Sequence, residues 1–365
     1  MWWKATIMQR NLLRLAPIGV AAVIVASCSQ ATTSGIPPSE NGAITSRPSA
    51  ALIQARSPEL VYVTDTNTVS AYPAKSSGPV APVIVLSDPK LPNTVWDPWG
   101  AVFDKSGYLY VQSFLSNATG FVYAPGARTG AKPVRVFTGD GPDVRGIGVD
   151  PAGYEYTATS DTGTELDVLP PKANGRPGNY YFVHPLRAIV TDGEWTPWPE
   201  VLTTDGKDEA IAGMVRYNGN AIEVFEGGAQ GSSSPIREIA GSKTGLGQNP
   251  QNLSVTFSAL TGFIYVGVSA GQNAHVSIFS DSANGDVAPI RTIRGSKTGL
   301  SGRDISGLAV SDRDGDLYVM SRTGSSVSGQ IYVYASDAKG NVPPLRSFVD
   351  KATGFTSAQG IGISH

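Results

Sequence analysis

Short apolar runs alternate with polar turns along most of the chain. The stretch 276–319 contains one full unit of this pattern: an alternating run at Val276 and Ile278, then the runs 289–293, 307–310 and 317–319, with Gly- and Asp-rich turns between them. Alternation over four to eight residues, bounded by turn formers, is typical of half-buried β-strands. Each unit is therefore predicted to form four short strands.

The unit occurs six times. Counted from the strand that reads Leu-Tyr-Val or similar, the copies begin at Leu60, Leu109, Tyr154, Ile211, Ile264 and Leu317. Repeats of about 40–50 residues with four strands each are typical of the blades of a propeller. The sequence therefore predicts an all-β fold, a six-bladed β-propeller of four-stranded blades.

Two positions within the unit support this alignment. Four copies carry Pro, an apolar residue and Arg where the outermost strand is expected, at 133–135, 235–237, 289–291 and 344–346. Proline lacks an N–H donor and suits the start of an exposed edge strand. The strand expected nearest the axis is rich in small and β-branched residues, as in 146–150 and 360–364, which fits a crowded centre.

The two ends of the repeat array are complementary. The final strand, 360–364, is an innermost strand without the rest of its blade, whereas the strand that starts at Leu60 belongs to a blade that lacks its innermost strand. We expect the C-terminal strand to complete the first blade, because this closes the ring and removes open sheet edges.

These motifs resemble the NHL-type family of six-bladed propellers. The resemblance rests on Gly-Ile-x-Val-Asp-x-x-Gly-x-Leu-Tyr-Val and Pro-x-Arg-x-Ile-x-Gly patterns and covers residues 59–365. It implies the architecture. It does not imply one activity, since such propellers serve as binding modules, scaffolds and, in a few cases, enzymes.

Residues 1–27 have the organisation of an export signal. Lys4, Arg10 and Arg14 precede an apolar core at 15–25, and a small-residue cleavage site ends at Cys28. The segment Val25-Ala26-Ser27-Cys28 resembles the lipobox of bacterial lipoproteins, which implies acylation of Cys28 by fatty acids such as palmitate, and several acyl chains together anchor a protein stably. A buried structural cysteine or a plain membrane anchor are the alternatives, although the apolar run is shorter than the ~20 residues that span a bilayer.

The segment that follows is predicted to be a disordered tether. Residues 29–58 are rich in Ser, Thr, Pro, Gly and Ala and poor in large apolar residues. The predicted organisation is thus a signal peptide at 1–27, lipidated Cys28 with a flexible tether at 28–58, and a propeller at 59–365. The resemblance to lipoproteins implies the bacterial cell envelope outside the cytoplasm, with the outer membrane favoured by Ser29 if the host has two membranes.

Composition narrows the chemistry. The net charge is −2 and becomes more negative once the leader is removed, so we expect no nucleic-acid partner. The three histidines are scattered, and no Gly-x-Ser-x-Gly elbow or phosphate-binding loop occurs. The run 312–316, Asp-Arg-Asp-Gly-Asp, lacks the spacing of a calcium loop and is predicted to be a strand-connecting turn. No catalytic residue, metal or cofactor is predicted.

Two Trp-Pro loops are the candidate ligand-binding features. Both are expected just before an innermost strand, which would place them on one face beside the axial mouth. The candidate residues, with rim positions from other repeats, are Trp96, Asp97, Trp99, Arg145, Trp195, Trp198, Glu200, Gln251 and Gln359. Aromatic rings beside carboxylates suit sugars, peptides or apolar ligands. The alternative is that the indoles pack between blades, because Trp is usually buried.

Three functions remain open from the sequence. The first is a membrane-anchored binding or scaffold module for an envelope protein, peptide or glycan. The second is a metal-dependent hydrolase that resembles gluconolactonases, whose axial metal would need residues such as Glu59, Asn252 and Asp304, although their sequence context does not match that family. The third is a structural envelope protein without a discrete site.

Overall fold

The computed structural model describes residues 58–365 except 66, 92–95, 114–118, 139–143, 160–164, 171, 173–186, 191–198, 205–208, 217–218, 228, 230–232, 248–251, 324–327 and 357. The predicted signal peptide, Cys28 and the tether up to residue 57 lie outside this range. Within the described residues, no helix is long and apolar enough to cross a membrane.

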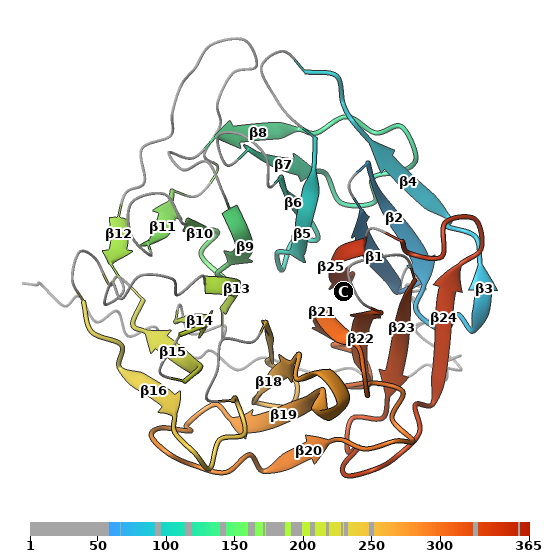
Figure 1. Cartoon of the computed structure of the whole chain (residues 1–365). Coiled ribbons are helices and arrows are strands. Elements are labelled where there is room, and N and C mark those ends of the chain that lie inside the picture. The colour runs from blue at the N-terminus through green and yellow to red at the C-terminus, as the bar shows by residue number, and fades with distance from the viewer. Residues whose placement is uncertain are drawn as a thin grey trace, which may run out of the picture. The chain divides into compact units, whose positions relative to one another are not determined.

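Six antiparallel sheets form the blades of a propeller, as the sequence predicts (Figure 1). From the axis outward, blade 1 consists of β25 (Ala358–Ile363), β1 (Leu60–Asp65), β2 (Thr68–Pro73) and β4 (Ile84–Ser87). Blade 2 consists of β5 (Pro98–Phe103), β6 (Leu109–Ser113), β7 (Thr119–Tyr123) and β8 (Arg135–Thr138). Blade 3 consists of β9 (Val144–Val149), β10 (Glu155–Thr159), β11 (Glu165–Leu169) and β12 (Arg187–Val190).

The second half of the ring repeats this order. Blade 4 consists of β13 (Pro199–Thr204), β14 (Ala210–Met214), β15 (Ala221–Phe225) and β16 (Arg237–Ala240). Blade 5 consists of β17 (Leu253–Ser258), β18 (Phe263–Val268), β19 (His275–Ser280) and β20 (Arg291–Ile293), with a short 3-10 helix η1 (Gly271–Asn273) before β19. Blade 6 consists of β21 (Asp304–Val310), β22 (Leu317–Arg322), β23 (Gly329–Tyr334) and β24 (Arg346–Asp350).

The C-terminal strand closes the ring, which confirms the prediction. β25 pairs antiparallel with β1, with Val61 opposite Ile363 and Val63 opposite Ile361, and the C-terminus lies near the axis (Figure 1). Glycine permits β25 to approach blade 2 closely: a Cβ on Gly360 would lie 2.3 Å from the Trp99 carbonyl oxygen. Side chains larger than hydrogen do not fit at this contact.

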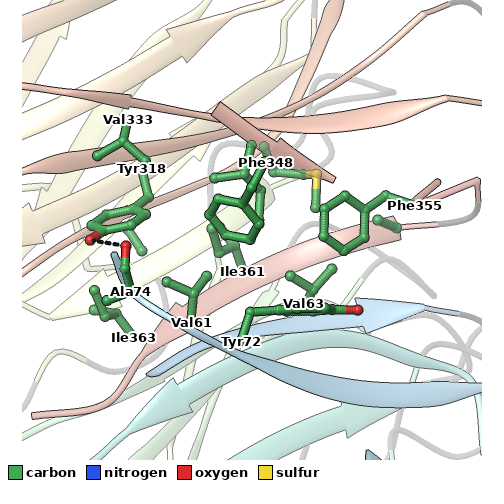
Figure 2. Close-up of a cluster of buried hydrophobic side chains, with 14 residues drawn as sticks. Val61, Val63, Tyr72, Ala74, Tyr318, Val333, Phe348, Phe355, Ile361 and Ile363 are labelled. Atoms are coloured by element: carbon green, nitrogen blue, oxygen red, sulfur yellow. Dashed lines mark hydrogen bonds between the residues drawn. The ribbon is translucent and has the colours of Figure 1, made fainter. Parts of the chain in front are cut away.

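The core lies between neighbouring blades. Figure 2 shows the junction of blades 6 and 1, where Tyr72, Phe348 and Phe355 pack edge to face or tilted, with the Tyr72 and Phe355 ring centroids 5.3 Å apart. The Tyr318 hydroxyl donates a hydrogen bond to the Ala74 carbonyl oxygen across the same junction (3.1 Å). Each blade is therefore held by the apolar faces of its two neighbours.

One strand was not expected from the sequence. β3 (Gly78–Val80), which leads from β2 to β4, pairs in parallel with β24 and gives blade 6 a fifth strand. Isolated parallel bridges join Ile239 to Gly285 and Ile293 to Gly340 in the same way. In blades 1, 5 and 6, the loop before the outermost strand thus bonds to the outermost strand of the preceding blade.

Candidate functional site

Five of the six innermost strands contain a β-bulge near their first residue. The pairing register shifts by one residue in β5, β9, β13, β21 and β25, whereas β17 pairs regularly. The residues left out of the pairing are Trp99, Arg145, Glu200, Ser306 and Gln359. Because a bulge frees one residue from the ladder and redirects its side chain, these positions form a ring at the end of the channel where the innermost strands begin.

The axial channel encloses about 380 Å³. This volume lies within the range of small-molecule pockets, roughly 300–1,000 Å³. Three bulge residues, Trp99, Ser306 and Gln359, line it. Three further residues line the same end of the channel. Asn252 directly precedes β17, Asp304 begins β21, and Arg322 ends β22, the strand that pairs with β21. We call this end of the channel the bulge mouth.

Trp99 and Asp97 interact at the bulge mouth. Asp97 is buried, and its backbone N–H donates to the Ser113 hydroxyl (2.8 Å). Burial raises the pKa of the Asp97 carboxyl, and a hydrogen bond with the Trp99 side chain partly offsets this effect. The Trp99 carbonyl accepts a hydrogen bond from the Thr64 hydroxyl of blade 1 (3.0 Å). Contacts to two blades therefore fix the position of this tryptophan.

Arg322 and Gln359 form the second polar pair at the mouth. The Arg322 Nη1 donates to the Gln359 Oε1 (2.9 Å). The Arg322 Nε and the Ser306 Oγ are buried without a hydrogen-bond partner. Neither Arg322 nor Ser306 was predicted from the sequence as a site residue. Ser306 could have been found, because it precedes a glycine as do Trp99, Arg145 and Gln359; Arg322 ends a second strand and had no such signal.

Trp96 has a different environment from Trp99. Its ring is buried in the core between blades 1 and 2, with its centroid 5.0 Å from that of Phe121 in an edge-to-face contact. The indole N–H donates to the Asn67 carbonyl (2.8 Å). Trp96 therefore has the packing role that was one of its two possible interpretations.

The remaining candidate residues are placed in part or not at all. Arg145 and Glu200 occupy bulge positions of β9 and β13, so their backbones lie at the bulge mouth, but their side chains are outside the described part. Trp195, Trp198 and Gln251 lie outside the described residues. Cys28 also lies outside them.

The opposite end of the channel is formed by turns. The carboxylates of Asp104 and Asp150 accept hydrogen bonds from the backbone N–H of Tyr108 and Tyr154, at 2.9 and 2.8 Å. The run 312–316 also forms a turn, closed by the hydrogen bond from Gly315 N–H to the Ser311 carbonyl (2.9 Å). These residues have the strand-connecting role that the sequence predicts.

The side chains of His365 and Asp312 lie in hydrogen-bonding contact at this end. The His365 Nδ1 lies 2.6 Å from the Asp312 Oδ2. The hydrogen bond to Asp312 raises the pKa of His365, although burial acts in the opposite direction. This pair joins the second residue after β25 to the turn of blade 6.

The three residues considered for a gluconolactonase-like metal do not converge. Asp304 begins β21 at the bulge mouth, and Asn252 lies at the same end. The Glu59 Oε1 accepts a hydrogen bond from the Ser311 hydroxyl (2.8 Å). Ser311 follows the last residue of β21, at the opposite end of this strand from Asp304. At roughly 3.3 Å per residue, the length of this strand separates the two carboxylates by about 20 Å. They cannot bind the same ion.

A comparison with a solved structure supports the fold. No protein-family model and no curated protein matches the sequence. A crystal structure of a protein of unknown function from Bacteroides caccae is similar, with a TM-score of 0.57 and 12% identity over 85% of this chain and 100% of that chain. The structure of U3-55K has a TM-score of 0.49 at 11% identity (80% and 79% covered), and the RRP9 WD40 repeats 0.47 at 10% (80% and 81%). At 12% identity, the likeness to the first of these structures concerns the fold alone.

Proposed function

We propose that this protein is a lipid-anchored propeller of the bacterial cell envelope that binds a protein, peptide or glycan at the bulge mouth. The observation that carries the proposal is the ring of bulges. Three of the bulge residues, with different chemistry, line one end of the channel: an indole, a hydroxyl and an amide. A regular propeller does not need an extra residue in its innermost strands, whereas bulges commonly redirect side chains at binding sites.

The position of Trp99 supports recognition rather than packing alone. It lines the channel, in contrast to Trp96, and contacts with Asp97 and Thr64 hold it in place. A fixed aromatic ring beside hydrogen-bonding groups suits the apolar face of a sugar or a peptide side chain.

The binding part of the proposal is tested by substitution at the two ends of the channel. Trp99→Ala should reduce recovery of an envelope partner in a pull-down from solubilised envelopes at least tenfold. Leu260→Ala is the matched control, because Leu260 is 54% exposed in the turn between β17 and β18 at the opposite end. Equal recovery with wild type and Trp99→Ala, at unchanged urea midpoints, would refute the bulge mouth as the site.

The anchor is tested separately. The proposed lipidation rests on the lipobox-like sequence that ends at Cys28. Cys28→Ser should abolish metabolic labelling with a palmitate analogue and move the protein from the membrane fraction to the soluble fraction. Labelling that persists in this variant would contradict the acyl anchor and leave the propeller proposal intact.

A further inference from the structure

We propose that the bulge mouth binds a small ligand through the ligand's carboxylate, with Arg322 as the recognising cation. This inference rests on the proposed binding function and specifies its ligand class. It begins with the ionic environment of Arg322. Among the described residues, no carboxylate lies within 4.0 Å of its guanidinium, although Asp304 is its partner in the β21–β22 register.

The Arg322 guanidinium is only partly used in hydrogen bonds to the described residues. The guanidinium donates to Gln359, yet its Nε is buried without a partner, and the Ser306 hydroxyl is also unpaired. Both residues line the same cavity. Neither of these two atoms is reached from the cavity, because both are enclosed by protein. Among the described residues, the Arg322 Nη2 makes no hydrogen bond and is not one of the buried unpaired atoms, so it is the nitrogen that can donate to a ligand oxygen.

The loops of blades 4, 5 and 6 on this side of the ring carry positive charge, whereas the corresponding loop of blade 1 contributes Asp88 and Asp97 beside Lys90. In blades 4, 5 and 6, a loop leads from the outermost strand to the next innermost strand, on the side of the bulge mouth. The basic residues described in these loops are Lys243, Arg294, Lys297, Arg303 and Lys351. Those same described loop residues include no Asp or Glu. Cationic groups beside a concave site raise the local concentration of anions and their rate of association.

The chemistry favours a carboxylate over a phosphate. A guanidinium binds either group in a planar, two-pronged geometry. However, Asp304 lines the mouth next to Arg322, so a singly charged ligand meets less repulsion than a doubly charged one. The Trp99 ring lines the same cavity and can cover an apolar surface of the ligand. The carboxylate can belong to a sugar acid or to the C-terminus of a short peptide.

The experiment compares acids with their neutral counterparts. Calorimetric titration of the full-length protein would use galacturonate and galactose, the dipeptide Gly-Phe and its C-terminal amide, and inorganic phosphate. We expect at least one acid to bind, and to bind at least tenfold more tightly than its neutral counterpart and than phosphate. The acid that binds identifies the source of the carboxylate.

Variants locate the contact. Arg322→Gln should weaken binding of the acid at least tenfold, and Arg322→Lys should weaken it less, because it keeps the charge and loses the planar fork. Lys105→Gln is the control, since Lys105 lines the opposite end of the same channel, and it should bind as wild type does. Urea midpoints equal to wild type establish that the variants are folded.

Several results would overturn the inference. They are the absence of acid binding, equal binding by acid and neutral probe, tighter binding of phosphate, and undiminished binding by Arg322→Gln. A different result is that galactose and galacturonate bind equally well and that Trp99→Ala abolishes the binding of both. This result would refute recognition of a carboxylate and leave the proposed binding function standing.

Discussion

Glu155 is a carboxylic acid enclosed between two blades. It is fully buried, its Oε1 accepts a hydrogen bond from the Arg135 Nη1 of blade 2 (2.9 Å), and its Oε2 has no partner. Burial raises the pKa of Glu155 from its ordinary value of 4.5 to about 7, although Arg135 acts to lower it. The folded protein therefore holds this proton at pH values where the unfolded chain has released it.

This proton makes stability depend on pH. Between pH 4.5 and 7 the folded state binds more protons than the unfolded state, so the contribution of Glu155 is full at the acidic end and is lost as pH rises. A difference of this size between the folded and unfolded pKa values of Glu155 corresponds to at most about 3 kcal/mol of unfolding free energy. Urea unfolding at pH 5 and pH 8 should therefore show a smaller loss of stability in Glu155→Gln than in wild type. Glu226→Gln, at an exposed position, should match wild type; identical losses in all three proteins would contradict the prediction.

The residues of the bulge mouth could be predicted only in part. Trp99 was predicted from its Trp-Pro loop, and Arg145 and Gln359 from the equivalent rim positions of other repeats. All three proved to be bulge residues. The extra residue itself was not predicted, since a bulge has no fixed sequence. Arg322 was missed because it reaches the mouth from a neighbouring strand, a relation that depends on three-dimensional pairing.

The outermost strands are held by their arginines. Arg135, Arg291 and Arg346 each lie over an aromatic ring of the second strand of their own blade, at 5.2–5.6 Å from the ring centroid. Each also reaches the next blade, as when the Arg346 Nη2 donates to the Ala74 carbonyl (3.1 Å). The arginine of the Pro-x-Arg motif thus joins blades, a role that the motif alone did not indicate.

This contact predicts a difference between arginine and lysine. Arg346 also donates to Asp316 and to the Tyr318 hydroxyl, and lysine cannot reproduce this fork. Arg346→Lys should lower the unfolding free energy by about 1–2 kcal/mol, the value of one or two hydrogen bonds, measured by urea denaturation. Arg294→Lys is the control, because Arg294 is exposed and, among the described residues, its guanidinium donates one hydrogen bond, from Nη2 to the Asn273 side chain. Equal stability of Arg346→Lys and wild type would contradict the prediction.

Strands were predicted well and the connections between blades were not. Apolar alternation marks each long strand, so their order followed from the sequence. β3 is three residues long, Gly-Pro-Val, and has no room for a periodic pattern. Its existence depends on the edge that β24 offers, which is information from another blade.

At the scale of the whole molecule, closure depends on β25. This strand supplies Ala358, Ile361 and Ile363 to the core that blades 6 and 1 share. Deletion of 358–365 should lower the melting temperature and cause self-association, since β1 would be left as an unpaired edge.

Calorimetry and analytical ultracentrifugation test the closure. A synthetic peptide of residues 358–365, added to the truncated protein, should restore part of the lost stability. The substitution Gln359→Ala keeps the strand and should leave the protein monomeric. A monomeric truncated protein with an unchanged melting temperature would show that the ring does not need this strand.

The bulges affect which positions of the propeller tolerate substitution. A residue outside the pairing ladder does not set which face of the strand its neighbours occupy, so its identity can be exchanged without reversing the alternation of buried and exposed side chains along the strand. At Trp99, Ser306 and Gln359, libraries of substitutions can therefore re-engineer what enters the channel while the six sheets keep their assembly.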